Sequence, residues 1–551
     1  MAIHYKMRVM VTSHSLPRPP KSECADACAW RVSGETVVAA LADGAGAARA
    51  GAEASRRIVE SIVTNYCARP REWSPSRALG EFARIVNETL YRESMVRFDG
   101  PELVSTLSVA VIEGDRLFGL NVGDSRVYLS RGGLLRQLSE DHVDPAMSHV
   151  LLRAIGLSPT LEPYTFETDI ADGDVAVLCS DGVSNVLPHA EFSEQMRRRS
   201  SARVLVQEAR DRAKDHELDD MSAVVIDIAK TGRLPGVKAN PLTIPETLKR
   251  GEKVDGYELQ RSFAGTDRVW VAEKDDRRWI VKFAPVEARE DEESLARFIK
   301  EAWNAQRVAE ASPEPFVAAF TPERATVRYY VQEFVEAPSL KVLLKSRKLG
   351  VDDAVALGKF LCEAGVRLLQ LDLVHGDIKP ENLLVFTDYD RLRFKLIDLG
   401  IAAEVFSVTS RAGTASYLAP ERFQGAPVCE RTEIFAIGVT LYEALTGKYP
   451  FGEIERFQTP AFHGPKRPGT LNPNLPAWLE HVILRALSIE PGSRYQHFSE
   501  LAFDLAHPDK VEPFFHKDVP FVFRDPLAFY RTGFWALLAL TLYLILRLLT
   551  H

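Results

Sequence analysis

The 551-residue sequence is poor in cysteine and carries no excess of basic charge. Its six cysteines form no C-x-x-C pair and have no histidine partner nearby, which argues against a zinc site and against a disulfide framework. The formal net charge of -8 provides no basic surplus for binding a phosphate backbone, so nucleic acid is not an expected partner. These absences favour a protein of a reducing compartment.

The first 20 residues lack an apolar run of signal-peptide length, and the chain has neither an internal repeat nor a low-complexity tract. A long apolar run occurs only near the other end, at 533–546, GFWALLALTLYLIL. With the residues that follow, it provides about 18 residues, or about 27 Å of helix. A buried core helix is the alternative, but such helices usually keep one polar stripe. We therefore expect a transmembrane helix that anchors the chain in the inner (cytoplasmic) membrane, with the catalytic domains in the cytoplasm.

The chain is longer than one hydrophobic core usually supports, and its patterns change along its length. Short strand-like runs and two stretches of helical periodicity, around 51–68 and 76–96, come first. A segment rich in Pro, Gly and Lys follows, and then a β-rich part precedes a mostly helical one. The predicted divisions are a first domain at 1–229, a linker at 230–253, a second domain at 254–508, a connector at 509–531 and a transmembrane helix at 532–550.

Several aspartates stand at the ends of strand-like runs in the first domain. The motifs are ECADA with Asp26, LADGAG with Asp43, CSDGV with Asp181, and ELDDMSAVV with Asp219 and Asp220. One such aspartate alone is usually a turn former or a cap. Several together favour a hard divalent cation, because Mg²⁺ and Mn²⁺ prefer carboxylate and carbonyl oxygens.

These motifs, together with others of the first domain, resemble those of a known protein family. LADGAG, GDSR at 123–126, DH at 141–142, RAIGL, VLCSDGVSN and DDMSAVVIDI occur in the order seen in the metal-dependent protein phosphatases of type 2C. The resemblance implies an α/β/β/α sandwich, in which two packed antiparallel sheets are flanked by helices. It also implies two Mn²⁺ or Mg²⁺ ions that activate a water for attack on phosphoserine or phosphothreonine.

The resemblance also implies roles for single residues. Asp43 would bridge the two metals, and the Gly44 carbonyl would bind one of them. Asp181 and Asp219 would complete the shell of the other ion, where Asp219 is preferred to Asp220 because DDMS aligns with the family's Asp-Asn-x-Thr.

Three further features of this domain follow from the same resemblance. Asp26 would act through water in the second shell, and Asp124 would be a ligand of a third, weaker metal. Lys21 replaces the arginine that usually holds the substrate phosphate, which keeps the charge and loses the bidentate fork. Only ten residues separate His142 from Arg153, so the family's flap of about 30 residues is largely missing and the site should be open.

The second domain contains the residues that phosphoryl transfer from ATP requires. HGDIKPEN supplies Asp377, Lys379 and Asn382 at the spacing of a catalytic loop, and LIDLG supplies Asp398. This spacing alone is weak evidence. Together with WIVK, an acidic helix, GTASYLAPE and a closing arginine in order, it resembles the eukaryotic-like Ser/Thr protein kinases, whose domain is bilobal and α+β.

This second resemblance implies that Asp377 is the catalytic base, that Lys379 contacts the γ-phosphate, and that Asn382 and Asp398 hold Mg²⁺. The remaining implied roles concern ATP and the fold: Lys282 on the α/β-phosphates, Glu301 holding Lys282 from an αC helix, Val269 and Gln332 at the nucleotide, and Glu421 paired with Arg494.

The sequence departs from the kinase pattern in three places. Ser262, Ala264 and Asp267 replace the three glycines of the ATP loop, where backbone amides normally approach the phosphates. Ile280 stands where a small residue usually lines the adenine pocket. Gly376 replaces an arginine that normally clamps a phosphorylated activation loop and does no chemistry on ATP.

The sequence therefore predicts a bifunctional, membrane-tethered enzyme that adds phosphate to Ser/Thr and removes it. Expected partners are ATP, protein and phosphoprotein substrates and the chain itself, with Thr409, Ser410 and Thr414 as candidate autophosphorylation sites. The alternative is an active phosphatase with a pseudokinase that serves as a scaffold or binding module.

Overall fold

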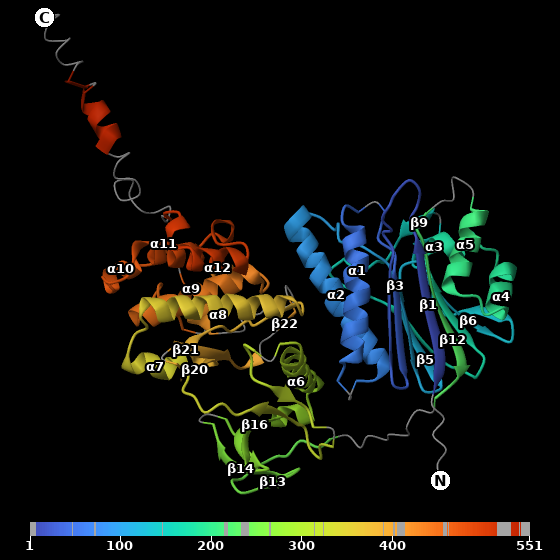
Figure 1. Cartoon of the computed structure of the whole chain (residues 1–551), viewed down its shortest axis with the longest axis horizontal. Coiled ribbons are helices and arrows are strands. Elements are labelled where there is room, and N and C mark those ends of the chain that lie inside the picture. The colour runs from blue at the N-terminus through green and yellow to red at the C-terminus, as the bar shows by residue number, and fades with distance from the viewer. Residues whose placement is uncertain are drawn as a thin grey trace, which may run out of the picture. The chain divides into compact units, whose positions relative to one another are not determined.

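The computed structural model describes residues 7–541 with short gaps. The gaps are 47, 71–72, 146, 214–218, 233–241, 264–265, 313, 323, 390, 400–402, 405–413, 456–459, 461, 515–529 and 539. The chain forms two compact units (Figure 1). Unit 1 comprises Met1–Glu246, Ala284–Trp303 and Arg324–Arg328, and unit 2 comprises Thr247–Phe283, Asn304–Glu323 and Tyr329–His551.

Unit 1 is built on two five-stranded antiparallel sheets. The first has the order β1 (Arg8–Leu16), β12 (Met221–Lys230), β11 (Val175–Cys179), β6 (Arg126–Arg131), β7 (Leu134–Gln137). The second has the order β10 (Tyr164–Asp169), β5 (Arg116–Val122), β4 (Leu107–Glu113), β3 (Thr36–Ala42), β2 (Ala27–Ser33). Strand β3 contributes alternate residues to two different cores, which explains its unbroken apolar run.

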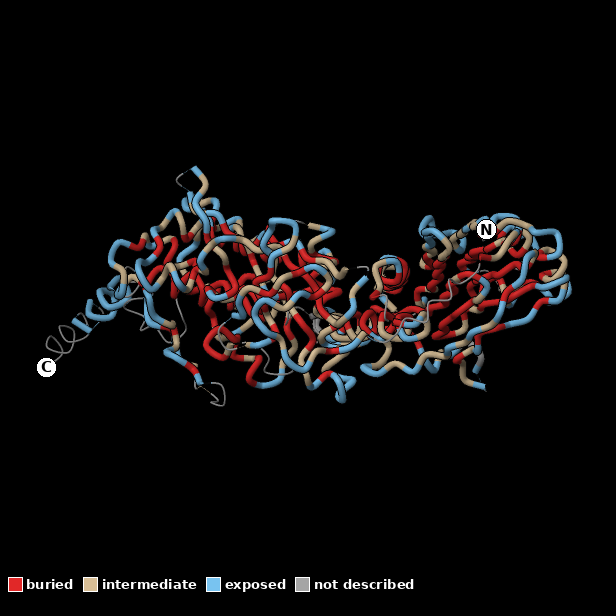
Figure 2. Tube along the Cα trace, turned by 90° about the horizontal axis from the view of Figure 1, so that it is seen from below, coloured by how far each residue is buried: buried red, intermediate tan, exposed pale blue. Residues whose placement is uncertain are grey.

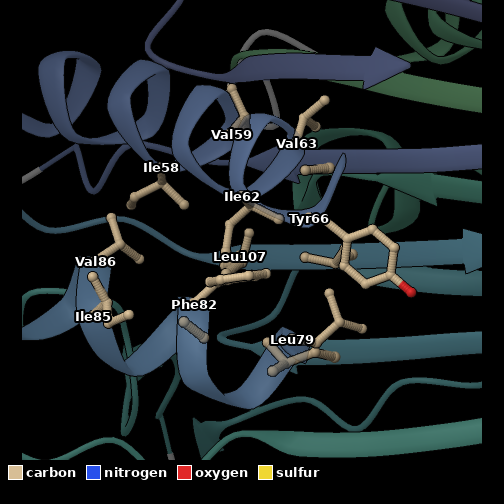
Figure 3. Packing of buried hydrophobic residues seen from close by; sticks show 14 of the residues in the cluster. Ile58, Val59, Ile62, Val63, Tyr66, Leu79, Phe82, Ile85, Val86 and Leu107 are labelled. Atoms are coloured by element: carbon tan, nitrogen blue, oxygen red, sulfur yellow. The ribbon is translucent and has the colours of Figure 1, made fainter. Parts of the chain in front are cut away.

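Helices cover both outer faces of this sandwich (Figure 1). Helices α1 (Gly51–Cys67) and α2 (Pro75–Phe98) lie on one side, and α3 (Asp181–Ser184), α4 (His189–Arg197) and α5 (Ala202–Arg212) lie on the other. Figure 3 shows Ile58 and Ile62 of α1 and Phe82 of α2 pointing toward one another above the sheet. The predicted sandwich and the helices expected around 51–68 and 76–96 are therefore confirmed.

A short hairpin occupies the position of the missing flap. It consists of β8 (Val143–Asp144) and β9 (Met147–Leu151), and the Leu152 amide donates to the His142 carbonyl oxygen at 2.8 Å. The hairpin is too short to cover a site as a flap of about 30 residues would.

Part of the predicted linker 230–253 is packed within unit 1. Ile244, 6% exposed, contacts the buried Ala284 and Ala288, and Thr243 forms a parallel bridge with Val327. Residues 233–241 of that linker lie outside the described residues. Residues 242–246 of the predicted linker thus belong to unit 1, and unit 2 begins at Thr247.

Unit 2 combines a six-stranded antiparallel sheet with a helical part. The sheet has the order β13 (Lys253–Val254), β14 (Tyr257–Ser262), β15 (Val269–Lys274), β16 (Arg277–Phe283), β18 (Tyr329–Glu333), β17 (Ala319–Phe320). The helices are α7 (Leu340–Ser346), α8 (Val351–Leu369), α9 (Glu430–Thr446), α10 (Pro468–Leu471), α11 (Ala477–Ala486) and α12 (Phe498–Ala506). Two small ladders complete the unit: β20 (Leu383–Asp388) with β21 (Arg391–Leu396), and β19 (Leu373–Val374) with β22 (Ala403–Glu404).

Burial separates the inside of each unit from its surface (Figure 2). Helix α9 is buried from Thr432 to Thr446, so it forms the centre of the helical part. Helix α6 (Glu292–Ala311) has its residues as far as Trp303 in unit 1.

The C-terminal segment is helical at 530–538 and at 540–541. Among the residues that the structure describes, no helix has both the length and the apolar character that crossing a membrane requires. The predicted transmembrane helix at 532–550 therefore has no support from the described residues, and 539 and 542–550 lie outside them.

Candidate active sites

Five aspartates of unit 1 come together where strands of both sheets end. Asp26 precedes β2, Asp43 follows β3, Asp124 lies between β5 and β6, Asp181 follows β11, and Asp219 lies just before β12. The negative charges of Asp26, Asp181 and Asp124 are close enough to raise the pKa of Asp43, and the charge of Asp219 raises the pKa of Asp181. The structure thus brings the predicted metal ligands into one cluster.

Burial and mutual repulsion keep protons on this cluster when it holds no cation. Burial raises the pKa of Asp26 to about 7 and the pKa of Asp124 to about 7. Burial, followed by the charges of Asp26 and Asp181, raises the pKa of Asp43 well above its ordinary value. Burial and the charge of Asp219 also raise the pKa of Asp181. Such a group of carboxylates is stabilised by positive charge.

The donor atoms fit a hard divalent cation. Both carboxylate oxygens of Asp26 are buried and accept no well-aligned hydrogen bond from the described residues. The other predicted donors are carboxylates and the Gly44 carbonyl, so the predicted set consists of oxygen atoms, which Mn²⁺ and Mg²⁺ prefer. Cys24 lies beside Asp26 and Asp220. Its sulfur is a softer donor than the oxygen ligands that Mn²⁺ and Mg²⁺ prefer.

The structure distinguishes the two adjacent aspartates at 219 and 220. Asp220 is 5% exposed, and its oxygens accept hydrogen bonds from the amides of Arg18 at 2.5 Å and Ala25 at 2.7 Å. The negative charge of Asp219 repels that of Asp181 within the acidic cluster. Asp220 therefore holds the segment that leads to Asp26, and Asp219 stays the predicted ligand.

We expect Asp219→Asn to weaken Mn²⁺ binding while the fold remains, since the lost charge faces the cluster. We expect Asp220→Asn to lower the melting temperature, because one of the two backbone amides that bind the buried Asp220 carboxylate loses a charged acceptor, at a cost of about 1–3 kcal/mol. Thermal unfolding and the Mn²⁺ concentration for half-maximal activity measure both effects. The opposite pattern would assign the metal to Asp220.

Sequence reasoning missed the hydroxyls that hold Asp43. The Asp43 amide donates to Thr106 Oγ1 at 2.9 Å, and Ser105 Oγ donates to the Asp43 carbonyl oxygen at 2.7 Å. The polar pair before the apolar run of β4 is the only signal that the sequence offers. Gly44 allows the close approach of α1, because a Cβ there would lie 2.5 Å from the Gly51 carbonyl carbon.

Lys21, the predicted phosphate-binding residue, is exposed in the turn before Asp26. Its amide donates to the Arg18 carbonyl oxygen at 2.9 Å. Arg18 is also exposed, so this turn carries a second cation that the sequence reasoning did not select.

The acidic cluster makes stability depend on pH and metal. Because the pKa values of Asp26 and Asp124 rise from 3.8 to about 7, the metal-free folded state binds more protons than the unfolded state between these values. Its stability should therefore fall as the pH rises through this range. Mn²⁺ should raise the melting temperature more at pH 7.5 than at pH 5.5. Thermal unfolding in EDTA and in Mn²⁺ checks this, and equal increases at both pH values would contradict it.

In unit 2, the predicted catalytic loop forms one hydrogen-bonded group. Lys379 Nζ lies 2.5 Å from Asp377 Oδ2 and 2.6 Å from Thr414 Oγ1. The Thr414 amide donates to Asp377 Oδ1 at 3.0 Å, and Asn382 Nδ2 donates to the Asp377 carbonyl oxygen at 3.0 Å. The predicted base, lysine and asparagine are thus together.

The strand register gathers the predicted nucleotide residues. Lys282 is opposite Val269, and Ile280 is opposite Gln332. Since residues 280 and 282 point to the same face of β16, and opposite residues share a face, all four belong to one face of the sheet. Lys282 Nζ lies 3.2 Å from Asp398 Oδ1, so the predicted phosphate-binding lysine and the predicted metal-binding aspartate are adjacent.

Two predicted features remain untested. Glu301 belongs to unit 1 and Lys282 to unit 2, so their pairing stays a prediction. Thr409 and Ser410 lie outside the described residues. The predicted structural pair is confirmed, because Arg494 donates to both oxygens of Glu421 at 2.6 and 2.8 Å.

A buried glutamate that the sequence reasoning missed supports the loop at Gly376. Glu433 of α9 accepts hydrogen bonds from the amides of His375 at 3.1 Å and Gly376 at 3.2 Å. Gly376 has a φ of 80°, in the left-handed region that favours glycine. A small cavity lies beside it, lined by Asp377, Arg422 and Glu433 among others.

Comparisons with known proteins agree with this geometry. Residues 20–226 match the family model of protein phosphatase 2C, and residues 265–496 match that of the protein kinase domain. A protein of Clostridium acetobutylicum named as a probable serine/threonine-protein kinase is 33% identical over 42% of this chain and 36% of its own length. Serine/threonine-protein kinase PknB of Mycobacterium tuberculosis is 30% identical over 47% of this chain and 44% of its own length. The chain thus spans less than half the length of these relatives.

Solved structures are similar to the first part of the chain. PppA, described as a key regulatory component of T6SS in Pseudomonas aeruginosa, is 26% identical, with a TM-score of 0.35, over 41% of this chain and all of that one. The serine/threonine phosphatase PstP/Ppp of Mycobacterium tuberculosis is 22% identical, with a TM-score of 0.34, over 40% of this chain and 98% of that one. The two family matches and the two sites together show that the chain joins a region similar to protein phosphatase 2C, residues 20–226, to a region similar to the protein kinase domain, residues 265–496.

Proposed function

We propose that the chain is a bifunctional enzyme, a Ser/Thr protein kinase and a metal-dependent Ser/Thr phosphoprotein phosphatase. The observation that supports this most is that each domain keeps the charged groups of its own reaction. The acidic cluster around Asp43 lies within unit 1, and the group formed by Asp377, Lys379 and Asn382 lies within unit 2.

In the phosphatase half, Asp43, Asp181 and Asp219 would hold two Mn²⁺ or Mg²⁺ ions, and Asp124 a third. Mn²⁺ is favoured because a similar structure, that of the catalytic domain of PstP, is described as a complex with two manganese ions. Bound metal would lower the pKa of a water and so supply the nucleophile. Asp26 would orient water beside the metals, and Lys21, with Arg18 in the same turn, would attract the substrate phosphate. The short hairpin at β8 and β9 would leave this site open to a protein surface.

In the kinase half, Lys282 would hold the phosphates of ATP, and Asn382 and Asp398 would hold Mg²⁺. Asp377 would accept the proton of the attacking hydroxyl, and Lys379, at 2.5 Å from it, would neutralise charge on the γ-phosphate. Val269 and Gln332 would contact the nucleotide on the sheet face that they share with Lys282.

We further propose that the phosphatase half removes phosphate that the kinase half places on its own activation segment. Joining the halves in one chain makes the encounter intramolecular, with an effective concentration on the order of millimolar. The Thr414 hydroxyl is bonded to Lys379 beside Asp377, where a phosphate would meet a carboxylate of like charge. This favours Thr409 and Ser410 over Thr414 as the residues that gain phosphate from the kinase half and lose it to the phosphatase half.

The experiment is a paired assay on the full chain. Labelled ATP measures phosphate incorporation, and Mn²⁺-dependent hydrolysis of p-nitrophenyl phosphate measures the phosphatase. Both activities are expected in the wild type, and Asp43→Ala should accumulate more label than the wild type. Hydrolysis without incorporation would leave the alternative, a phosphatase with a scaffold, which the altered ATP loop at Ser262 and Asp267 favours. If Asp43→Ala accumulates no more label than the wild type, the phosphatase half does not remove phosphate from the kinase half.

Attachment to the inner membrane through a single C-terminal helix, with the catalytic domains in the cytoplasm, remains a separate proposal. The apolar run at 533–546 supports it, together with the exposed side chains of Phe534, Trp535 and Leu537. Membrane fractions of cells that express the full chain should contain the protein, and a chain that ends at residue 526 should be absent from them. Equal fractionation of both would exclude the anchor.

A further inference from the structure

Helix α6 contributes to the core of unit 1 through one stripe of apolar residues. Leu295, Ile299 and Trp303 are spaced by four, so they lie on one side of the helix, and all three pack on the cluster formed by α1 and α2. Ile299 is 7% and Trp303 is 5% exposed. This part of α6 is therefore a piece of the phosphatase core, although it lies within the span that matches the kinase family.

Trp303 is the centre of this packing. Its ring centroid lies 6.2 Å from that of Trp73 and 5.5 Å from that of Phe82, and Trp73 and Phe82 are 5.7 Å apart. Trp303 Nε1 donates to the Ala68 carbonyl oxygen at 2.5 Å, directly after the last residue of α1. The indole thus supplies one of the hydrogen bonds that the end of a helix needs.

The other end of α1 touches the segments that carry the metal ligands. The first residue, Gly51, packs so closely on Gly44 that a Cβ on Gly51 would lie 3.0 Å from the Gly44 carbonyl carbon. Ser55 Oγ donates to the Ala25 carbonyl oxygen at 2.5 Å. Asp26 directly follows Ala25, and Asp43 directly precedes Gly44. A shift of α1 would therefore move both aspartates.

The opposite side of α6 carries the kinase residue. Glu301 stands two positions before Trp303, and residues so spaced do not share a helix face. Glu301 is the residue expected to hold Lys282, which in turn holds the phosphates of ATP. The same helix therefore packs Trp303 into the phosphatase core and carries Glu301, the residue expected to hold Lys282 in the kinase reaction.

We propose that α6 couples the two activities, so that nucleotide bound to the kinase half changes the metal affinity of the phosphatase half through Trp303 and α1. The inference rests on the proposed function, because it needs both sites to bind their ligands. The coupling must act in both directions, since linkage between two bound ligands is reciprocal. Coupled sites in proteins commonly change affinity by about 5-fold or more.

The test uses the full chain and p-nitrophenyl phosphate, which needs no docking surface. The Mn²⁺ concentration for half-maximal hydrolysis is measured with and without a non-hydrolysable ATP analogue, at fixed free Mn²⁺ because nucleotides chelate the metal. The analogue should shift this concentration at least about fivefold in the wild type. Trp303→Ala should remove the shift.

A matched control is Trp279→Ala, since Trp279 packs on Phe320 within unit 2 at 5.6 Å between ring centroids. The control should keep the shift, and melting temperatures show whether each variant is folded. If Trp303→Ala unfolds, the shift is measured in Trp303→Phe instead, because that variant keeps an aromatic ring and loses the hydrogen bond to Ala68. A reduction of the shift by at least about half supports the coupling, and a full shift overturns it.

The outcomes separate this inference from the proposed function. Absence of Mn²⁺-dependent hydrolysis in the wild type would refute the phosphatase half itself. Hydrolysis with no response to the analogue, or with the same response in Trp303→Ala, would leave the proposed function intact and overturn the coupling.

Discussion

Asp43→Asn is expected to lower Mn²⁺-dependent phosphatase activity at least about 10³-fold, because the loss of the proposed shared ligand of two metals would remove several kcal/mol of transition-state stabilisation. The fold should survive, since Thr106 and Ser105 hold the backbone of Asp43 and not its carboxylate. The metal-free variant should be at least as stable as the metal-free wild type, because one of several repelling charges is gone. Mn²⁺ should then stabilise it less. Hydrolysis of p-nitrophenyl phosphate and thermal unfolding measure these effects.

Asp172→Asn is the matched control for this variant. Asp172 lies on the surface of the same unit, where it accepts hydrogen bonds from the backbone and side chain of Thr231. Its replacement should leave hydrolysis unchanged. Activity within tenfold of the wild type in Asp43→Asn would show that Asp43 does not bridge the metals.

Asp377→Asn is expected to lower phosphate incorporation by about 10²–10⁴-fold, the usual contribution of a positioned general base. Asn keeps the shape of the side chain and can still accept the hydrogen bond from the Thr414 amide, but it cannot take the proton of a hydroxyl. The salt bridge with Lys379 is lost as well. Phosphatase activity should persist, because the acidic cluster of unit 1 contains none of these residues.

Asp388→Asn serves as its control, since Asp388 is an exposed partner of Arg393 at the end of β20. That variant should incorporate phosphate as the wild type does. Unchanged incorporation in Asp377→Asn would mean that the label comes from another kinase and that the second domain is a scaffold.

Local patterns in the sequence predicted much of the fold. Helices α1 and α2 follow from apolar residues at helical spacing, and their bounds differ from the expected ones by one or two residues. The strand ends at Asp43 and Asp181 follow from apolar runs that stop at a carboxylate. The acidic cluster could be predicted because a resemblance fixed which of these ends meet.

Long-range contacts could not be predicted in this way. Asp219 and Asp220 are neighbours in the same motif, and they differ through the amides of Arg18 and Ala25, about 200 residues away in the chain. Glu433 looks like an ordinary acidic residue near a helix start, yet it binds the backbone at Gly376. These roles depend on tertiary structure, which local spacing does not encode.

The linker shows the same limit. Ile244 stands in a proline-rich stretch whose composition predicts an unstructured connection, but a single apolar side chain was enough to pack on Ala284 and Ala288. Composition describes the average behaviour of a segment, whereas burial of one residue depends on what surface lies nearby.

The backbone at Gly376 has a consequence for any side chain placed at this position. An arginine restored there by mutation would have to adopt a left-handed conformation, which costs a residue with a side chain about 1–2 kcal/mol. The two hydrogen bonds that the His375 and Gly376 amides donate to Glu433 hold the loop in that conformation. A substitution of Gly376 by arginine is therefore opposed by the backbone itself, apart from any role of the side chain in the kinase reaction.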